Sequence, residues 1–277
     1  MVTLKHGAII WYREVLRYWR EKSRIIGSLM MPFFFLVIFG SGLSSSIGGM
    51  LGGAGGMGLD FKKFMFPGII GMTILFTSIS SGLSVVRDKN HGFLKEILVA
   101  PVERIAVAGG RILGGSTVAM IQATLLFIFA PFVGISITPI LVLKVWGLVL
   151  LGSIGFTSLG NFIGSKLDST EGFQMVMNFL VMPMFFLSGA FFPLKDIPIW
   201  MAAIVRVNPF SYLVDSVRQI FFISMGFTST MMESLPENGL GITIFNTRVT
   251  ILMDIGIMTF FALVLLLFAV RSYHQME

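Results

Sequence analysis

The sequence predicts an all-α integral membrane protein with one transmembrane domain, residues 1–277. Of its 277 residues, 55% are hydrophobic and only 12% are charged, whereas an ordinary soluble domain has roughly 25% charged residues. The mean hydropathy is +0.88. The apolar residues also gather into runs of about 20, the length that a helix needs to cross a hydrocarbon core of about 30 Å. These observations indicate several membrane-spanning helices.

Six runs have the length of a transmembrane helix. We expect them near residues 25–43, 66–86, 112–135, 140–164, 174–192 and 251–270. Only residues 136–139 separate the third run from the fourth, so these two are predicted to form a hairpin. The small-residue pairs Gly110/Gly114 and Gly160/Gly164 favour close packing between helices.

Charge predicts the orientation of the chain. With the N-terminus inside, the cytoplasmic segments would hold 13 of the 20 Lys and Arg residues, so both termini are expected in the cytoplasm of a plasma-membrane (inner-membrane) protein. The net charge of +6 is explained by topology and lipid headgroups rather than by nucleic-acid binding. No cysteine is present, which excludes disulfides. We expect no cleavable signal peptide.

Residues 1–24 predict an amphipathic helix in the membrane interface. Arg13, Arg17 and Arg20 fall on one stripe, and Trp11 and Trp19 fall on the opposite face. One interpretation is an anchor that fixes the entry of the first span. The other is a helix that moves with a motor and gates access from the lipid.

Residues 87–102, RDKNHGFLKEILVAPV, form a charged amphipathic segment between the second and third spans. Gly92 and Pro101 bracket a helix of about two turns. Because so short a helix needs a surface to pack on, we expect a cytoplasmic partner to dock there; the alternative is a loop helix resting on lipid. The candidate coupling residues are Arg87, Asp88, Gly92, Leu94, Glu96, Leu98 and Pro101.

Residues 184–218 close the fifth span and begin an outer region, 193–250, of re-entrant or interfacial helices. Pro193 and Pro198 interrupt the segment, and the apolar stretches after them are too short to span. This region is interpreted as an outer gate, or else as a passive cap. The candidate gate residues are Ser188, Gly189, Pro193, Asn208, Pro209, Tyr212, Asp215 and Arg218.

These segments resemble those of the permeases of type-2 ATP-binding-cassette exporters, which include daunorubicin-resistance, polysaccharide-export and nodulation-type permeases. The similarity rests on R-x4-G-x-L-x3-L-V-x-P-V at 87–102, SGAFFP at 188–193 and NPFSYLVDSVR at 208–218. It implies a dimer of permeases, expected here as a homodimer, working with two cytoplasmic ATPase subunits through a coupling helix at 87–102. The Gly-rich stretch 48–58 departs from the family pattern.

The motifs that the sequence lacks fit a subunit whose energy comes from a separate protein. The sequence has no G-x4-G-K-[ST] phosphate loop, so we expect no enzyme activity and no bound cofactor or metal, with ATP and Mg on the partner ATPase. Asp254 is the single carboxylate of the predicted spans, which argues against an ion-coupled carrier. We expect it at headgroup level or paired with a base such as Arg248.

The sequence therefore predicts the membrane subunit of an ATP-driven exporter of hydrophobic or amphipathic, drug- or lipid-like molecules. The 28 Phe and 19 Met residues would supply a deformable apolar lining. Polar span residues such as Thr77 and Gln122 are expected to bond across helices more often than to touch cargo. One alternative is export of a lipid-linked polysaccharide, with Trp11, Trp19 and Trp200 as sugar platforms. A membrane-embedded enzyme or an assembly factor is another.

Overall fold

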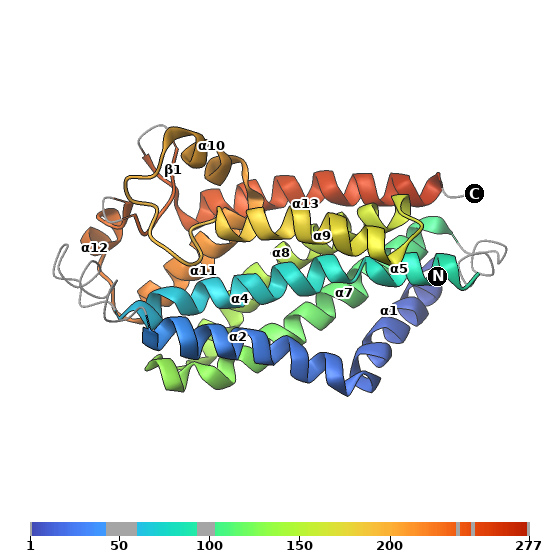
Figure 1. The fold of residues 1–277 in the computed structure, drawn as a ribbon, viewed down its shortest axis with the longest axis horizontal. Coiled ribbons are helices and arrows are strands. Elements are labelled where there is room, and N and C mark those ends of the chain that lie inside the picture. Colours follow the sequence, from blue (N-terminus) through green and yellow to red (C-terminus); the bar gives the residue numbers. More distant parts are fainter. Residues whose placement is uncertain (1, 43–59, 93–102, 237–238, 245–246, 276–277) are drawn as a thin grey trace.

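The computed structural model describes residues 2–42, 60–92, 103–236, 239–244 and 247–275, which form an elongated helical bundle (Figure 1). The long helices are α1 (Val2–Arg20), α2 (Lys22–Gly42), α4 (Phe61–Ser80), α7 (Arg104–Leu126), α8 (Pro139–Lys166), α9 (Thr170–Phe186), α11 (Pro209–Ser224) and α13 (Ile251–His274). The short elements are α5 (Leu83–Asn90), η1 (Phe127–Phe129), η2 (Pro131–Val133), α10 (Ile199–Val207), α12 (Ser229–Glu233), β1 (Thr243–Ile244) and β2 (Thr247–Arg248). The two strands pair antiparallel, with Thr243 opposite Arg248.

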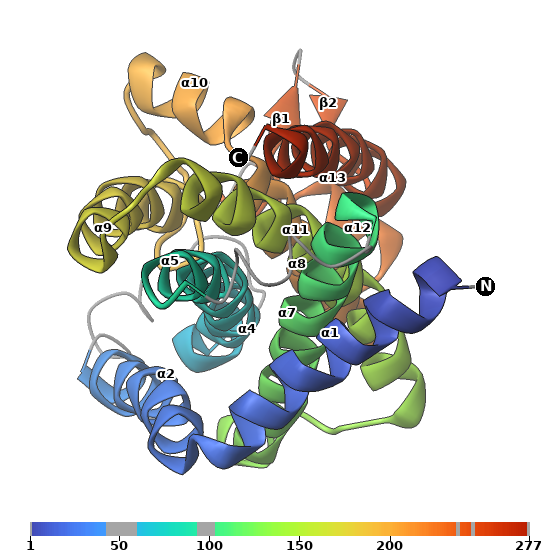
Figure 2. The same cartoon turned by 90° about the vertical axis from the view of Figure 1, so that its right-hand side faces the viewer.

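Both chain termini lie at one end of the bundle, which we call the terminal end, and α10, α12 and the strands lie at the opposite end (Figure 1). Seen from the terminal end, α1 crosses over α7, and α4 lies between α2 and α9 (Figure 2). The helices α8, α11 and α13 complete the enclosure of α4 and α7. The main hydrophobic core therefore follows α4, most of whose side chains are buried.

Four helices are long and apolar enough to cross a membrane: Phe61–Asn90, Arg104–Phe129, Pro139–Lys166 and Ile251–Tyr273. Lys5–Arg20 and Ile25–Gly40 would add a fifth as one span bent by 67°. These findings confirm a mostly helical, multi-pass membrane protein. The run predicted at 174–192 forms α9, whose 17 residues end at Phe186 because Ser188 and Gly189 turn the chain, Gly189 with a φ of +75°.

The predicted hairpin of the third and fourth runs is confirmed, since α7 and α8 pack against each other along their length. The connection is longer than predicted: η1 and η2 follow the end of α7 at Leu126. The helix itself begins at Arg104, before the apolar run predicted at 112–135.

Glycine contacts set two of the helix crossings. A Cβ on Gly160 would lie 2.2 Å from the carbonyl oxygen of Ile79, so α8 meets the end of α4 backbone to backbone. A Cβ on Gly110 would lie 2.5 Å from the carbonyl oxygen of Gly7, which puts α1 directly on α7. The two small-residue pairs are therefore confirmed as packing sites, and the partner of Gly110 is the N-terminal helix.

The two helices after Pro198 differ in their surroundings. In α10, Ile199 is 90% exposed and Trp200 is also exposed, as suits an interfacial helix. In α11, every residue from Phe210 to Phe222 is buried among α4, α8 and α13. Protein therefore surrounds the backbone of α11 along almost all of its length.

Candidate functional site

At the terminal end, the carboxylate of Asp88 in α5 binds three arginines. Arg111 of α7 donates to Oδ2 at 2.6 Å, and Arg13 of α1 donates to the same oxygen at 2.7 Å. Arg17 of α1 donates to Oδ1 at 3.4 Å. We call these four residues the Asp88 cluster. Its ion pairs join α1, α5 and α7 at the point where the predicted coupling segment begins.

The Asp88–Arg111 pair is shielded from water, whereas Arg13 and Arg17 are partly exposed. Arg111 is only 1% exposed and the Asp88 side chain 8%. Glu14 adds a second carboxylate, 3.2 Å from Arg13 and 3.8 Å from Arg17. Because a buried guanidinium without a counter-ion is costly, Asp88 allows the Arg111 side chain to be buried on α7, directly before the apolar run that starts at residue 112.

The structure describes three of the predicted coupling residues, and they differ in exposure. Asp88 is buried and faces the arginines, so it does not present its carboxylate to a docking partner. Arg87 is exposed, and Gly92, with a φ of +75°, follows the helix end. Leu94, Glu96, Leu98 and Pro101 lie outside the described residues.

The residues predicted for the interfacial helix also differ in their surroundings. Arg13 and Arg17 turn toward Asp88 instead of facing headgroups, because Asp88 and Glu14 supply better-shielded partners. Arg20 and Trp19 are exposed. The Trp11 indole Nε1 donates to Thr117 Oγ1 at 2.9 Å, which fixes α1 on α7.

Lys89 makes a second connection from α5. Its Nζ donates to Asp168 Oδ1 at 2.7 Å and to the carbonyl oxygens of Ser165 and Leu167 at 3.1 and 3.3 Å. The hydrogen bond and the charge of Lys89 hold the pKa of Asp168 below its ordinary value. The C-terminal end of α8 is thereby fastened to α5.

At the opposite end, the two motifs assigned to the outer gate contact each other. The Arg218 guanidinium donates to the carbonyl oxygen of Gly189 at 2.6 Å and lies 4.2 Å from the centroid of the Phe64 ring. Asn208 Nδ2 donates to the carbonyl oxygen of Met184 at 2.6 Å. The end of α9 is therefore held against α11.

The other predicted gate residues have local partners. Ser188 Oγ donates to the carbonyl oxygen of Phe185 at 2.6 Å, and the Tyr212 hydroxyl donates to that of Arg206. Pro209 starts α11, and Pro193 is half-buried in the loop before α10. The structure thus brings Ser188, Gly189, Asn208 and Arg218 together, whereas Asp215 belongs to a different group.

Residues 7–222 match the family model described as ABC-2 type transporter. The chain belongs to this family. The transport permease ycf38 of Cyanophora paradoxa is 27% identical over 218 residues, which are 77% of this chain and 73% of the relative. The inner membrane transport permease YadH of Escherichia coli K12 is 24% identical over 225 residues, 76% of this chain and 81% of YadH. A third relative, YbhR of E. coli K12, is 28% identical over 170 residues, 59% of this chain and 45% of YbhR.

The protein is thus a permease, the membrane subunit of an ABC transporter, a class that works with ABC ATPase subunits. Its polar span residues bond across helices, as predicted: Thr77 of α4 contacts Gln122 of α7, and Gln122 Nε2 donates to Ser28 Oγ of α2 at 2.8 Å. These side chains connect the three helices inside the apolar bundle.

Sequence reasoning missed one buried polar group of the permease. Gln219 Nε2 donates to Asp215 at 2.7 Å and to Asp254 at 3.0 Å, and Arg248 donates to Gln219 Oε1 at 2.8 Å. Asp254 is fully buried in the protein, and Gln219 connects it with Arg248, the base named as its expected partner. The available signal was the four-residue spacing of Asp215 and Gln219 on one helix face.

Proposed function

We propose that this permease is the membrane subunit of an ATP-driven exporter that moves hydrophobic or amphipathic, drug- or lipid-like molecules out of the cytoplasm. The Asp88 cluster carries the proposal. It fastens α1 and α7 to α5, immediately before residues 93–102, the segment on which a partner ATPase would act. A push on that segment would therefore move three helices together, because separating Asp88 from Arg111 would leave a buried charge unpaired.

The complete transporter would be a homodimer of six-span permeases with two ATPase subunits in the plasma membrane. Here α2 and α9 would join the four long helices as spans. The terminal end would face the cytoplasm, since it gathers arginines and lysines from α1, α5, α7 and α8. YadH, named an inner membrane permease, supports the location.

The cargo class is supported by the name of YbhR, which assigns it to multidrug ABC transporters. The polysaccharide alternative needs aromatic side chains in a continuous track. Trp11 and Trp19 lie on α1 at the terminal end, whereas Trp200 lies on α10 at the opposite end. This separation favours a drug- or lipid-like molecule over a sugar chain.

The first experiment tests ATPase docking. The permease is co-expressed with an ABC ATPase encoded by the same genome, and co-purification is measured for the wild type, Leu94→Asp and Ile199→Asp. We expect Leu94→Asp to lose the ATPase. The control Ile199→Asp places the same charge on an exposed residue at the opposite end and should retain it. Equal ATPase recovery with both variants would contradict docking at 87–102.

The second experiment tests the source of energy. Sealed vesicles containing the permease and its ATPase should accumulate a fluorescent amphiphile with ATP and lose that activity when the ATPase carries an inactive nucleotide site. Vesicles with the permease alone receive a proton or sodium gradient. Accumulation driven by the gradient alone would overturn the proposal.

A further inference from the structure

Two adjoining cavities run from the terminal end into the bundle. The first, of about 240 Å³, lies between α1, α4, α5 and α7, and the second, of about 320 Å³, lies between α2, α4 and α7. Thr77 and Ser80 line both, so the cavities meet at these two side chains. The larger one alone reaches the range of about 300–1,000 Å³ that is typical of ligand pockets.

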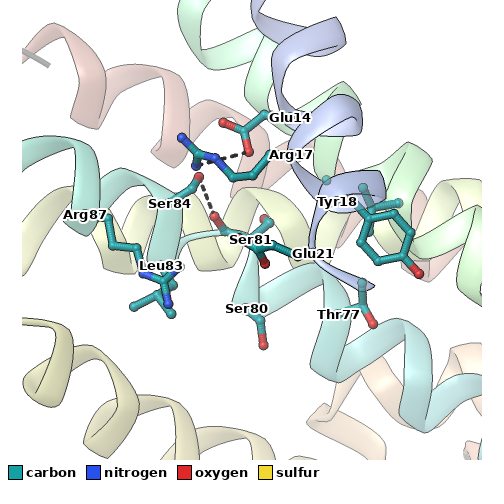
Figure 3. Close-up of a pocket in the computed structure, with 12 residues that line it drawn as sticks. Glu14, Arg17, Tyr18, Glu21, Thr77, Ser80, Ser81, Leu83, Ser84 and Arg87 are labelled. Carbon is teal, nitrogen blue, oxygen red and sulfur yellow. Dashed lines mark hydrogen bonds and ion pairs between the residues drawn. The ribbon is translucent and has the colours of Figure 1, made fainter. Parts of the chain in front are cut away.

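The first cavity has a charged lining. Figure 3 shows Arg17 and Glu14 of α1 facing Ser81 and Ser84 across it, with Arg87 on the same side as the serines. Arg17 is paired with Glu14 and Asp88. The Arg87 guanidinium, in contrast, has no hydrogen-bond or ion-pair partner among the described residues, which leaves a cation available to an anionic group.

Hydroxyl groups surround the junction of the cavities. Ser80 and Thr77 line it from α4, and Ser28 lines the second cavity from α2. The side chain of Gln122 bonds both Thr77 and Ser28 and so fixes the positions of these hydroxyls. The junction is polar but uncharged.

Beyond the junction the lining is apolar. Met31 and Pro32 of α2 face Met72 and Phe76 of α4 across the second cavity. Methionine and phenylalanine side chains adapt to flexible apolar ligands. The carboxylates Glu14 and Glu21 also line the first cavity, on its α1 side and beyond it. Along the α5 and α4 side, the order is an unpaired cation, then hydroxyls, then an apolar slot. A phospholipid has the matching order of phosphate, ester groups and acyl chain.

We propose that these cavities bind one membrane phospholipid, with its phosphate at Arg87, its ester groups beside Ser80 and one acyl chain along Met72 and Phe76. The site is made by the helices of a single protomer. On the orientation proposed above, it opens at the cytoplasmic leaflet, where the bend between α1 and α2 lies. The further step, that the bound phospholipid marks the class of exported cargo, rests on the proposed transport function.

The binding test uses the full-length permease in vesicles that contain a phosphatidic acid with a photoactivatable acyl chain. A parallel sample contains the corresponding diacylglycerol, which lacks the phosphate. After illumination, labelled peptides are identified by mass spectrometry. We expect label on residues 27–32 and 72–80.

Two variants probe the two halves of the site. A Cβ on Gly27 meets no atom within 4 Å, so Gly27→Leu would fill the apolar cavity and should reduce labelling by both probes. Gly256→Leu is the matched control, because Gly256 of α13 is equally unobstructed and lines none of these cavities.

Arg87→Gln should weaken phosphatidic acid labelling about tenfold, the effect of one lost charge-assisted hydrogen bond, and spare diacylglycerol labelling. Arg20→Gln, on an exposed arginine outside the cavities, should change neither.

Label spread over exposed residues such as Phe179 and Phe260, unchanged by Gly27→Leu, would overturn the site. Equal effects of Arg87→Gln on both probes would overturn the phosphate assignment.

Labelling requires no ATPase, so it separates this inference from the proposed function. If the ATPase co-purifies but the cavities remain unlabelled, only the phospholipid site fails. If the cavities are labelled but no ATPase binds, the site stands and the transport proposal fails.

Discussion

Arg218 of α11 donates a hydrogen bond of 2.6 Å to the backbone carbonyl oxygen of Gly189 in the turn after α9. The residues are 29 positions apart in the sequence, yet this contact and the Phe64 ring beside it make one buried junction of α4, α9 and α11. The motifs SGAFFP and NPFSYLVDSVR therefore act as one structural unit.

Replacing Arg218 by Met should destabilise the permease by about 1.5–3 kcal/mol, because the buried Gly189 carbonyl loses a charged donor. Thermal unfolding followed by fluorescence-detected size-exclusion chromatography would measure the change. Arg206→Met serves as the control, since Arg206 is exposed and bonds the carbonyl oxygen of Thr243 near the surface. Equal shifts for the two variants would argue against a special role for the Arg218 junction.

Asp88→Asn should be among the most damaging single changes at the terminal end. It leaves the buried Arg111 without its counter-ion, and breaking a buried pair in this way costs about 3–5 kcal/mol. Thermal stability should be partly recovered in the double variant Asp88→Asn with Arg111→Met, because the unpaired guanidinium is then removed. Additive losses in the double-mutant cycle would show that the two residues do not interact.

Two glycines of α8 should respond to alanine in opposite directions. In Gly160→Ala the new Cβ would lie 2.2 Å from the Ile79 carbonyl oxygen, so α8 and α4 must separate, at a cost of about 1–3 kcal/mol or more. In Gly147→Ala the Cβ meets nothing within 4 Å, and the better helix propensity should add up to about 1 kcal/mol. The thermal midpoints of both variants check the prediction, and a tolerant Gly160 would refute the close crossing.

The Lys89–Asp168 ion pair should make part of the stability dependent on pH. Since Lys89 lowers the pKa of Asp168 in the folded protein, the pair stabilises fully above the ordinary aspartate pKa of about 3.9. That stabilisation is lost as the pH falls through the lowered pKa. Thermal midpoints between pH 7 and pH 3 should fall less steeply at the acid end for Asp168→Asn than for the wild type. Asp196→Asn, which changes an exposed carboxylate outside any described ion pair, should follow the wild type.

Local composition was sufficient to predict the helical, membrane-spanning character of the chain. The apolar runs predicted the bundle because the hydrocarbon core requires helices of that length, and Gly160 and Gly164 marked a true crossing. Helix ends were less predictable, since they depend on distant residues. Arg111, just before the apolar run, is buried inside α7, where Asp88, 23 positions earlier, pairs with it.

The candidate site was predictable to a similar extent. The motifs pointed to Asp88 and Arg218, but not to what these residues contact. Asp88 was a candidate coupling residue, and the structure adds that it binds arginines from α1, whose sequence pattern suggested lipid headgroups. Gln219 carried no signal strong enough to connect Asp215 with Asp254. Such contacts arise from three-dimensional packing, which no local pattern in one sequence records.

The position of α4 between α2 and α9 has a mechanical consequence (Figure 2). A rigid rod with a neighbour on each side cannot approach one without receding from the other. If a movement of α5 tilted α4 sideways, α4 would move away from α2 and toward α9, or away from α9 and toward α2. One small displacement at the terminal end would thus loosen the packing on one flank of the permease and tighten it on the other.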